Sequence, residues 1–348
     1  MTGRASLIGG AAAAAVLSLA GCPGRRPVLA RVNAPEIFEQ RSGVAADLRA
    51  VVAVDGQTGW ASGTGGTWLR TIDAGSTWIS GTVPGAQLLD FRSLAAFDAR
   101  RAIVLSAGSP ARMFRTGDGG GSWSEVYRND APGIFFDALR FADEARGYAL
   151  ADPIAGHFVI LESADSGATW HDLPGPQAMP GEGAFAASNS SLAVRGDHLW
   201  FGTGGAVARV FRSADRGRTW TATDALAPSG APSRGVFSLA FVSDRQGALV
   251  GGDYQGPDAP GALAITQDGG TTWTAGPAPP GYRSSVVFLD PERLVTTGTS
   301  GTDSARAGDD WRPVGPGMNA LSAWGATGWA VGPKGRVARF VARQTGGP

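Results

Sequence analysis

One short segment combines the residue types of three kinds of functional loop. In residues 116–123 (TGDGGGSW) a hydroxyl side chain is followed by an aspartate two residues on, then by glycines and a tryptophan. Glycine-rich loops bind phosphate, acidic loops bind Ca²⁺, and a short acidic side chain at a reverse turn accepts hydrogen bonds from backbone N–H groups. The chemistry of this segment therefore depends on its surroundings.

The same pattern recurs along the chain, in a context that argues against the first two kinds of loop. Further copies are TIDAGSTW (71–78), SADSGATW (163–170), SADRGRTW (213–220), TQDGGTTW (266–273) and the altered SARAGDDW (304–311). No copy precedes a helical pattern or carries the lysine of a phosphate loop, and none has the ligand set of an EF-hand. We therefore interpret the octapeptide as a structural turn.

Each position of the octapeptide has a structural role in this interpretation. The aspartate accepts backbone hydrogen bonds that fix the turn, the glycine at the fifth position takes a positive φ, and the tryptophan is buried between neighbouring units. The residues assigned to these roles are Asp73, Trp78, Asp118, Trp123, Asp165, Trp170, Asp215, Trp220, Asp268 and Trp273.

The spacing of the copies predicts the fold. Successive final tryptophans are 45, 47, 50, 53 and 38 residues apart, which is the length of a propeller blade of four strands. Short β-branched and aromatic runs separated by Gly and Asp precede each copy, and no sustained helical period is present. We expect an all-β, seven-bladed β-propeller over residues 36–343, with inner strands starting near Leu48, Phe91, Phe136, Phe185, Phe237, Arg283 and Met318.

The seventh unit ends without a copy of the octapeptide, so its outer strand must come from elsewhere in the chain. Residues 37–42 (IFEQRS) precede the first unit and form a strand-like run. We expect this N-terminal strand to complete the last blade, which closes the ring and removes its free edges. Residues 344–348 would then form a C-terminal tail.

The first residues resemble an export signal. An apolar run after Arg4 ends in LAGC (residues 19–22), which is too short for a membrane span and resembles the bacterial lipobox. We expect a lipoprotein signal peptide at 1–21, lipidation of Cys22, which is the only cysteine, and a tether at 22–35. Because Asp does not follow the cysteine, this expectation places the protein in the cell envelope, at the periplasmic side of the outer membrane of a Gram-negative bacterium.

Composition and charge limit the kinds of partner. The chain has 30 basic and 30 acidic residues, so no overall positive field attracts nucleic acid. The only membrane contact that we expect is through lipidated Cys22. The three histidines have no metal-ligand spacing, and we expect no cofactor, no metal and a monomer.

A ring of polar side chains is expected where the inner strands begin, at the top face. Three arginines there could grip a carboxylate through forked hydrogen bonds, which favours an acidic peptide or protein as ligand. The alternative is that these arginines pair with Asp137, Asp152 and Asp253 and only hold blades together. The candidate residues of this mouth are Arg49, Arg92, Asp137, Asp152, Glu182, Asp253, Tyr254, Tyr282 and Arg283.

The octapeptide resembles the Asp-box, or BNR repeat, of sialidases and other propellers. The longer unit, in which a hairpin such as residues 60–71 runs directly into the box, resembles the photosystem II stability and assembly factor family and its bacterial relatives. Residues 201–213 and 328–340 carry the same resemblance. It implies a seven-bladed propeller with a non-catalytic, protein-binding role in assembly.

A second hypothesis is a sialidase-like glycoside hydrolase. Such an enzyme would need three arginines on the substrate carboxylate, a tyrosine paired with a glutamate, and an acidic aspartate. The Arg-Ile-Pro element that sialidases carry near the start of the propeller is missing from this sequence. The residues that would fill these roles are Arg49, Arg92, Arg283, Tyr282 or Tyr254, Glu182 and Asp137.

Overall fold

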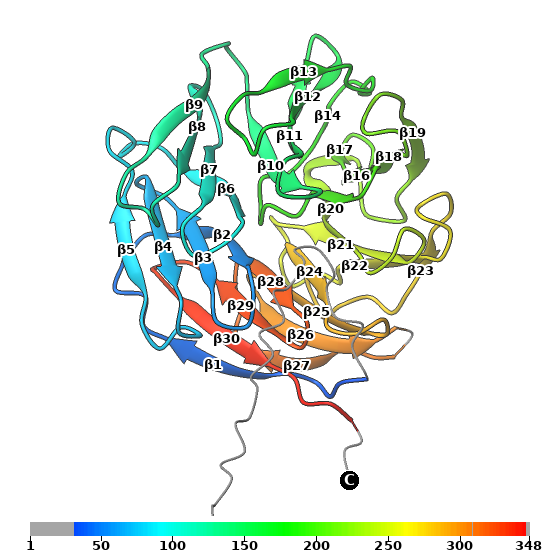
Figure 1. The fold of residues 1–348 in the computed structure, drawn as a ribbon. Coiled ribbons are helices and arrows are strands. Elements are labelled where there is room, and N and C mark those ends of the chain that lie inside the picture. Colours follow the sequence, from blue (N-terminus) through cyan, green and yellow to red (C-terminus); the bar gives the residue numbers. More distant parts are fainter. Residues whose placement is uncertain (1–30, 308, 346–348) are drawn as a thin grey trace, which may run out of the picture.

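A computed structural model describes residues 31–307 and 309–345 as a ring of seven antiparallel sheets around one axis (Figure 1). Within these ranges the chain forms strands and turns and no helix, as the sequence predicts. The seven-bladed β-propeller is therefore confirmed. Cys22 and the expected signal peptide lie outside the described residues, so export and lipidation stay predictions.

Each blade has four main strands, which run from the axis to the rim. In Figure 1 the inner strands β2, β6, β10, β20, β24 and β28 face the centre, and the outer strands lie at the periphery. The blades are β2 (Leu48–Ala53), β3 (Gly59–Gly63), β4 (Thr67–Thr71), β5 (Ile79–Thr82); β6 (Phe91–Ala96), β7 (Ala102–Ser106), β8 (Ala111–Thr116), β9 (Ser124–Asn129); β10 (Phe136–Phe141), β11 (Gly147–Ile154), β12 (His157–Ser163), β13 (His171–Leu173); β15 (Leu192–Arg195), β16 (His198–Gly202), β18 (Arg209–Ser213), β19 (Thr221–Asp224); β20 (Ala231–Phe241), β21 (Gly247–Asp253), β22 (Ala262–Thr266), β23 (Thr274–Ala275); β24 (Ser285–Phe288), β25 (Arg293–Gly298), β26 (Gly301–Arg306), β27 (Arg312–Gly315); and β28 (Ala320–Trp324), β29 (Thr327–Val331), β30 (Val337–Val341), β1 (Glu36–Gln40).

The N-terminal strand closes the ring. Strand β1 pairs antiparallel with β30, from Glu36 opposite Val341 to Gln40 opposite Val337. The chain before β1 is also fixed, because the Val32 N–H donates to the Asp290 carboxylate at 2.7 Å. Residues 31–35, assigned to the tether from sequence, therefore lie against the sixth and seventh blades.

Each blade packs on the next through a layer of buried apolar side chains. Between the first and second blades this layer holds Trp60, Trp68 and Phe91, and the box residue Trp123 packs on it with its ring edge-on to Trp60 at 6.5 Å. Large aromatic rings bury much apolar area in such layers. The box tryptophans Trp78, Trp170, Trp220 and Trp273 pack on the equivalent layers of other blades.

The box turn is held by a fixed set of hydrogen bonds. The Asp118 carboxylate accepts from the Thr116 hydroxyl at 2.9 Å and from the Ser122 N–H and hydroxyl at 2.9 and 2.7 Å. Gly120 has a φ of 94°, as predicted for the fifth position. The Gly119 N–H donates to the Arg100 carbonyl in the β6–β7 turn, so the box turns and these hairpin turns share one face. We call it the bottom face, and the side where the inner strands begin the top face.

Acid should weaken the protein through the five intact boxes. Hydrogen bonds, first those from the hydroxyl at the seventh position, hold the pKa of each box aspartate at about 2, below its usual 3.8. A carboxyl whose pKa is lowered by folding stabilises the fold above its unfolded pKa, and this stability is lost as pH falls through the folded pKa. We expect the urea midpoint to fall between pH 4 and pH 2.

The contribution of one box can be isolated with Asp73→Asn. The wild-type protein should exceed this variant in urea midpoint at pH 6, and the difference should shrink toward pH 2. A difference independent of pH would contradict the role of the ionised carboxylate.

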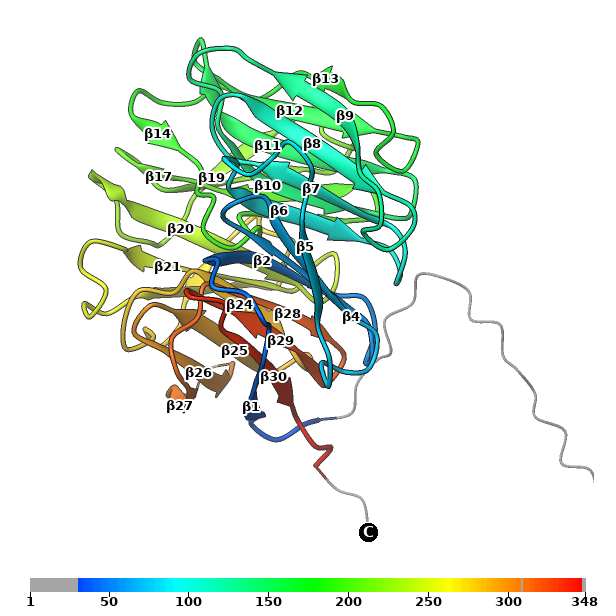
Figure 2. The ribbon, with the colours of Figure 1, turned by 90° about the vertical axis from the view of Figure 1, so that its left-hand side faces the viewer.

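One predicted boundary is wrong. The inner strand of the fourth blade begins at Leu192, not near Phe185. Residues 184–191 instead cross the top end of the central channel, and Glu182–Gly183 (β14) and Gly204–Gly205 (β17) form a small extension of the fifth blade's sheet. Figure 2 shows β14, β17 and the start of β20 on one side of the ring.

Candidate functional site

Four inner strands place a side chain at the mouth by the same local irregularity. In the first and second blades the pairing register skips Arg49 and Arg92, and in the third and fifth it skips Asp137 and Phe237. Such a β-bulge leaves one residue outside the ladder and re-aims its side chain. The bulges thus explain why these four residues, which align in sequence, occupy equivalent positions in their inner strands.

Arg49 carries the available positive charge of the mouth. Its side chain is half-buried, and the buried Nε has no hydrogen-bond partner within the described parts of the chain. Burial lowers the pKa of Arg49, and the nearby charge of Arg92 lowers it further, while the charges of Asp90 and Asp47, and then Tyr282, act in the opposite direction. Arg49, Arg92 and Tyr282 therefore share one neighbourhood, although they come from different blades.

The other two predicted arginines already have carboxylate partners. Arg92 Nε donates to Asp90 at 2.7 Å. Arg283 is buried and pairs with buried Asp303, and its Nη1 donates to the Tyr282 carbonyl at 2.8 Å. Neither pairs with Asp137, Asp152 or Asp253, so the predicted alternative of pairing among those residues is not what the structure contains.

An aromatic cluster forms the opposite wall of the mouth. The Phe237 ring stacks on Phe185 with centroids 3.8 Å apart and meets Tyr282 edge-on at 4.7 Å. Tyr254 meets Phe237 edge-on at 6.1 Å and is 47% exposed, whereas Tyr282 is 5% exposed. The phenol ring of Tyr254 therefore offers an accessible flat surface beside the mouth.

A polar segment fills the channel below the mouth. The Asn189 side chain donates to the Leu94 carbonyl at 2.7 Å and accepts from the Leu139 N–H at 2.8 Å. The Ser188 hydroxyl donates to the Ser284 carbonyl at 2.6 Å, which links the fourth blade to the sixth. These bonds join four blades. The segment that contains Ser188 and Asn189 therefore forms a floor that keeps a ligand at the top face from entering the channel.

Two carboxyl groups of the third blade lie in low-dielectric surroundings. Asp137 is fully buried, and neither of its carboxylate oxygens has a hydrogen-bond partner among the described residues. Desolvation, together with the charge of Asp152, raises the pKa of Asp137 well above its usual value. Burial also raises the pKa of Asp152, whose Oδ1 accepts from the Ala184 N–H at 2.9 Å.

The remaining predicted acids are held by arginines. Glu182 is buried, accepts from Arg209 Nε at 3.0 Å and from the Thr203 hydroxyl at 2.6 Å, and has no hydrogen bond to a tyrosine of the described chain. Asp253 pairs with Arg234 at 2.9 Å, and this hydrogen bond holds the pKa of Asp253 at about 2. Both acids therefore brace loops rather than present free charge.

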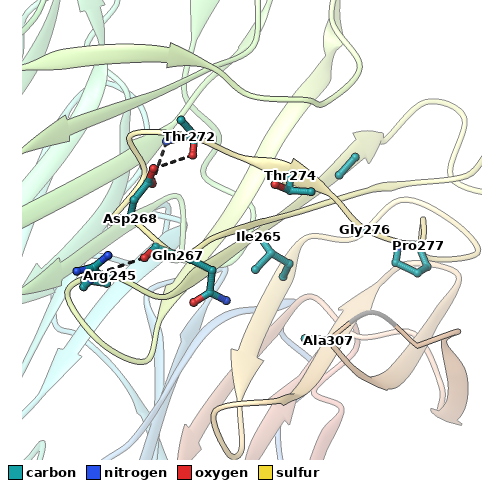
Figure 3. Close-up of a pocket in the computed structure, with 10 residues that line it drawn as sticks. Arg245, Ile265, Gln267, Asp268, Thr272, Thr274, Gly276, Pro277 and Ala307 are labelled. Carbon is teal, nitrogen blue, oxygen red and sulfur yellow. Dashed lines mark hydrogen bonds between the residues drawn. The ribbon is translucent and has the colours of Figure 1, made fainter.

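Two cavities are open on the described surface. One, of about 730 Å³, lies at the top face between the third, fourth and fifth blades and is lined by Asp152, Glu182 and Phe185 among others. The other, of about 570 Å³, lies beside the box turn of the fifth blade (Figure 3). Its Asp268 is bonded to Thr272 and its Arg245 to the Gln267 carbonyl, as the dashed lines in Figure 3 show.

The described residues contain neither a metal-binding cluster nor a membrane-spanning helix. No group of three or more His, Cys, Asp or Glu side chains there is arranged to hold a metal ion. No helix in the same ranges has the length and apolarity needed to cross a bilayer.

Solved structures share this fold. A structure titled "YCF48 bound to D1 peptide" has a TM-score of 0.60 at 17% identity and covers 93% of this chain and all of that one. YCF48 from Cyanidioschyzon merolae has a TM-score of 0.64 at 16% identity and covers 88% and 99%. The glycoside hydrolase GH74 xyloglucanase from Xanthomonas campestris has a TM-score of 0.57 at 17% identity, over 90% of this chain and 55% of that one.

Curated relatives found from sequence are glycosidases. A Paenibacillus sp xyloglucanase is 27% identical over 244 residues, which are 60% of this chain and 23% of that protein. The oligoxyloglucan-reducing end-specific xyloglucanase of Emericella nidulans is 30% identical over 139 residues, 39% of this chain and 16% of that protein. The chain thus spans less than a quarter of the length of these relatives. No family model matches it.

Proposed function

We propose that the protein is a non-catalytic binding propeller that holds an acidic segment of a partner protein at its top face. The observation that carries the proposal is Arg49, a half-buried guanidinium with an unpartnered Nε. A desolvated cation forms strong charge-assisted hydrogen bonds with a carboxylate. Arg92 lies close enough for its charge to act on Arg49, but it is paired with Asp90, so Arg49 is the arginine that we expect to bind the carboxylate.

The surroundings of Arg49 suit a peptide. The exposed ring of Tyr254 and the partly exposed ring of Phe185, which stacks on buried Phe237, give apolar surface at the mouth. The floor made by Asn189 keeps a bound chain on the surface instead of within the channel. The fold similarity to a YCF48 structure with a bound peptide supports this class of ligand.

A pair of labelled peptides tests the proposal. Fluorescein-Gly-Ala-Glu-Ala with a free carboxyl terminus should bind the wild-type protein saturably, and its Lys-for-Glu, amidated counterpart should not. Arg49→Ala should weaken binding of the acidic peptide at least tenfold, or about 1.4 kcal/mol. The change removes the available guanidinium without breaking an ion pair.

The matched control is Arg100→Ala, an exposed arginine of the second blade at the bottom face. This variant should bind the acidic peptide as the wild-type protein does. Equal affinities of wild type and Arg49→Ala, or no saturable binding to either, would contradict the proposal.

A glycosidase is the second candidate, and it is favoured by the sequence relatives. A sialidase-type site would pair a tyrosine with Glu182, but this carboxylate is held by Arg209 and Thr203. We expect no release of sugar from xyloglucan oligosaccharides or from a fluorogenic sialoside. Turnover of either by the purified protein, lost in Asp152→Asn, would favour the enzyme.

A further inference from the structure

Two acidic residues lie at the top-face end of the first two strands of the third blade. Asp137 is the bulged residue of β10, and Asp152 is the bulged residue of the facing strand β11. They flank the paired residues Phe136 and Ala151. The charge of Asp152 acts on Asp137, so both carboxyl groups belong to one electrostatic site.

Within the described residues, no arginine or lysine forms an ion pair with either carboxyl group. Arg92, whose charge reaches Asp137, is bonded to Asp90, and Arg209 on the far side of the cavity is bonded to Glu182. A buried carboxylate without hydrogen bonds is costly. Both oxygens of fully buried Asp137 lack a partner in the described chain, so the site is incomplete by itself.

The pair is accessible through the top-face cavity. Asp152 lines this cavity and is half-buried, whereas Asp137 is fully buried and is not one of the lining residues. Gly183 lets the backbone of the cavity wall lie close to the Asp152 carboxyl, because a Cβ at this position would stand 2.8 Å from Asp152 Oδ1. Phe185 adds an aromatic edge on which the methylene groups of a long side chain can lie.

We propose that this cavity is a binding site for the guanidinium or ammonium group of a basic peptide side chain, recognised by Asp152, the unpaired acid that lines it. The proposal deepens the function given above and rests on it for the source of the group: the peptide whose carboxylate binds Arg49 also carries an Arg or Lys. The ligand class is then a bipolar peptide segment and not a uniformly acidic one.

The probe is acetyl-arginine amide, with acetyl-citrulline amide as its neutral isostere. By NMR titration the wild-type protein should bind the arginine compound saturably and the citrulline compound at least tenfold more weakly. Asp152→Asn should weaken arginine binding at least tenfold, since it removes the accessible charge. Asp137→Asn should fold normally, because the buried Asp137 carboxyl has no hydrogen-bond partner among the described residues, and it should weaken arginine binding less than Asp152→Asn does.

Two controls separate this site from the rest of the molecule. Asp172→Asn, at an exposed position of the outer strand β13 in the same blade, should bind like wild type. Arg49→Ala should also retain acetyl-arginine amide binding, so a failure of the acidic-peptide proposal and a failure of this one are distinguishable. Equal binding by wild type and Asp152→Asn, equal binding of arginine and citrulline, or no binding at all would overturn the inference.

Discussion

Arg283→Met is expected to lower the free energy of unfolding by about 3–5 kcal/mol. Arg283 and Asp303 are 1% and 2% exposed and form an ion pair within the sixth blade. Removing the cation leaves the Asp303 carboxylate buried without its counterion, and this uncompensated charge is the main cost. Because Arg283 also donates to the Tyr282 carbonyl, the substitution should loosen the aromatic wall of the mouth. Urea unfolding followed by tryptophan fluorescence measures the change.

The double variant Arg283→Met with Asp303→Leu separates charge from packing. Replacing both partners by apolar side chains removes the uncompensated charge, so the double variant should be more stable than the single one. A single variant within about 1 kcal/mol of wild type would show that the pair is dispensable. A double variant less stable than the single one would show that packing dominates.

Trp200→Ala is expected to cost about 3–5 kcal/mol, the range for removing a large aromatic side chain from a core. The indole is fully buried, stacks on Phe241 at 3.8 Å and donates from Nε1 to the Gly269 carbonyl at 2.7 Å. It thus joins the fourth blade to the box turn of the fifth. The expected result is a large drop in the urea midpoint, because packing and a hydrogen bond are lost at the interface between these two blades.

Two substitutions bracket this effect. Trp200→Phe keeps most of the packing and loses the hydrogen bond, so it should cost less than Trp200→Ala. Leu88→Ala removes a side chain that is 100% exposed and should change stability by no more than about 0.5 kcal/mol. A Trp200→Ala protein as stable as Leu88→Ala would contradict the account of how the blades are joined.

The fold could be predicted because the octapeptide recurs along the sequence, about once per blade. The spacing of the box tryptophans gives the blade length, and the incomplete seventh unit requires a strand from the N-terminus, which β1 supplies. The fourth blade was misplaced because Phe185 lies in a segment that reads like the other inner strands. A tertiary interaction, the stacking of Phe185 on Phe237, holds that segment over the channel instead.

The candidate site was less accessible to sequence reasoning. Alignment brought Arg49, Arg92 and Asp137 to one step of the ring, and the bulges explain that agreement. Which charges are already compensated could not be read from the sequence. The pairing of Arg283 with Asp303, 20 residues away, depends on where β24 and β26 lie in space. No local sequence pattern predicts this pairing.

Hydrogen exchange with and without the acidic peptide tests most directly whether a partner is held at the top face. The account predicts slower exchange at the starts of β2 and β6 and around Tyr254, with the box turns at Asp118 and Asp268 unchanged. Protection confined to the box turns, or absent at the start of β2, would contradict it.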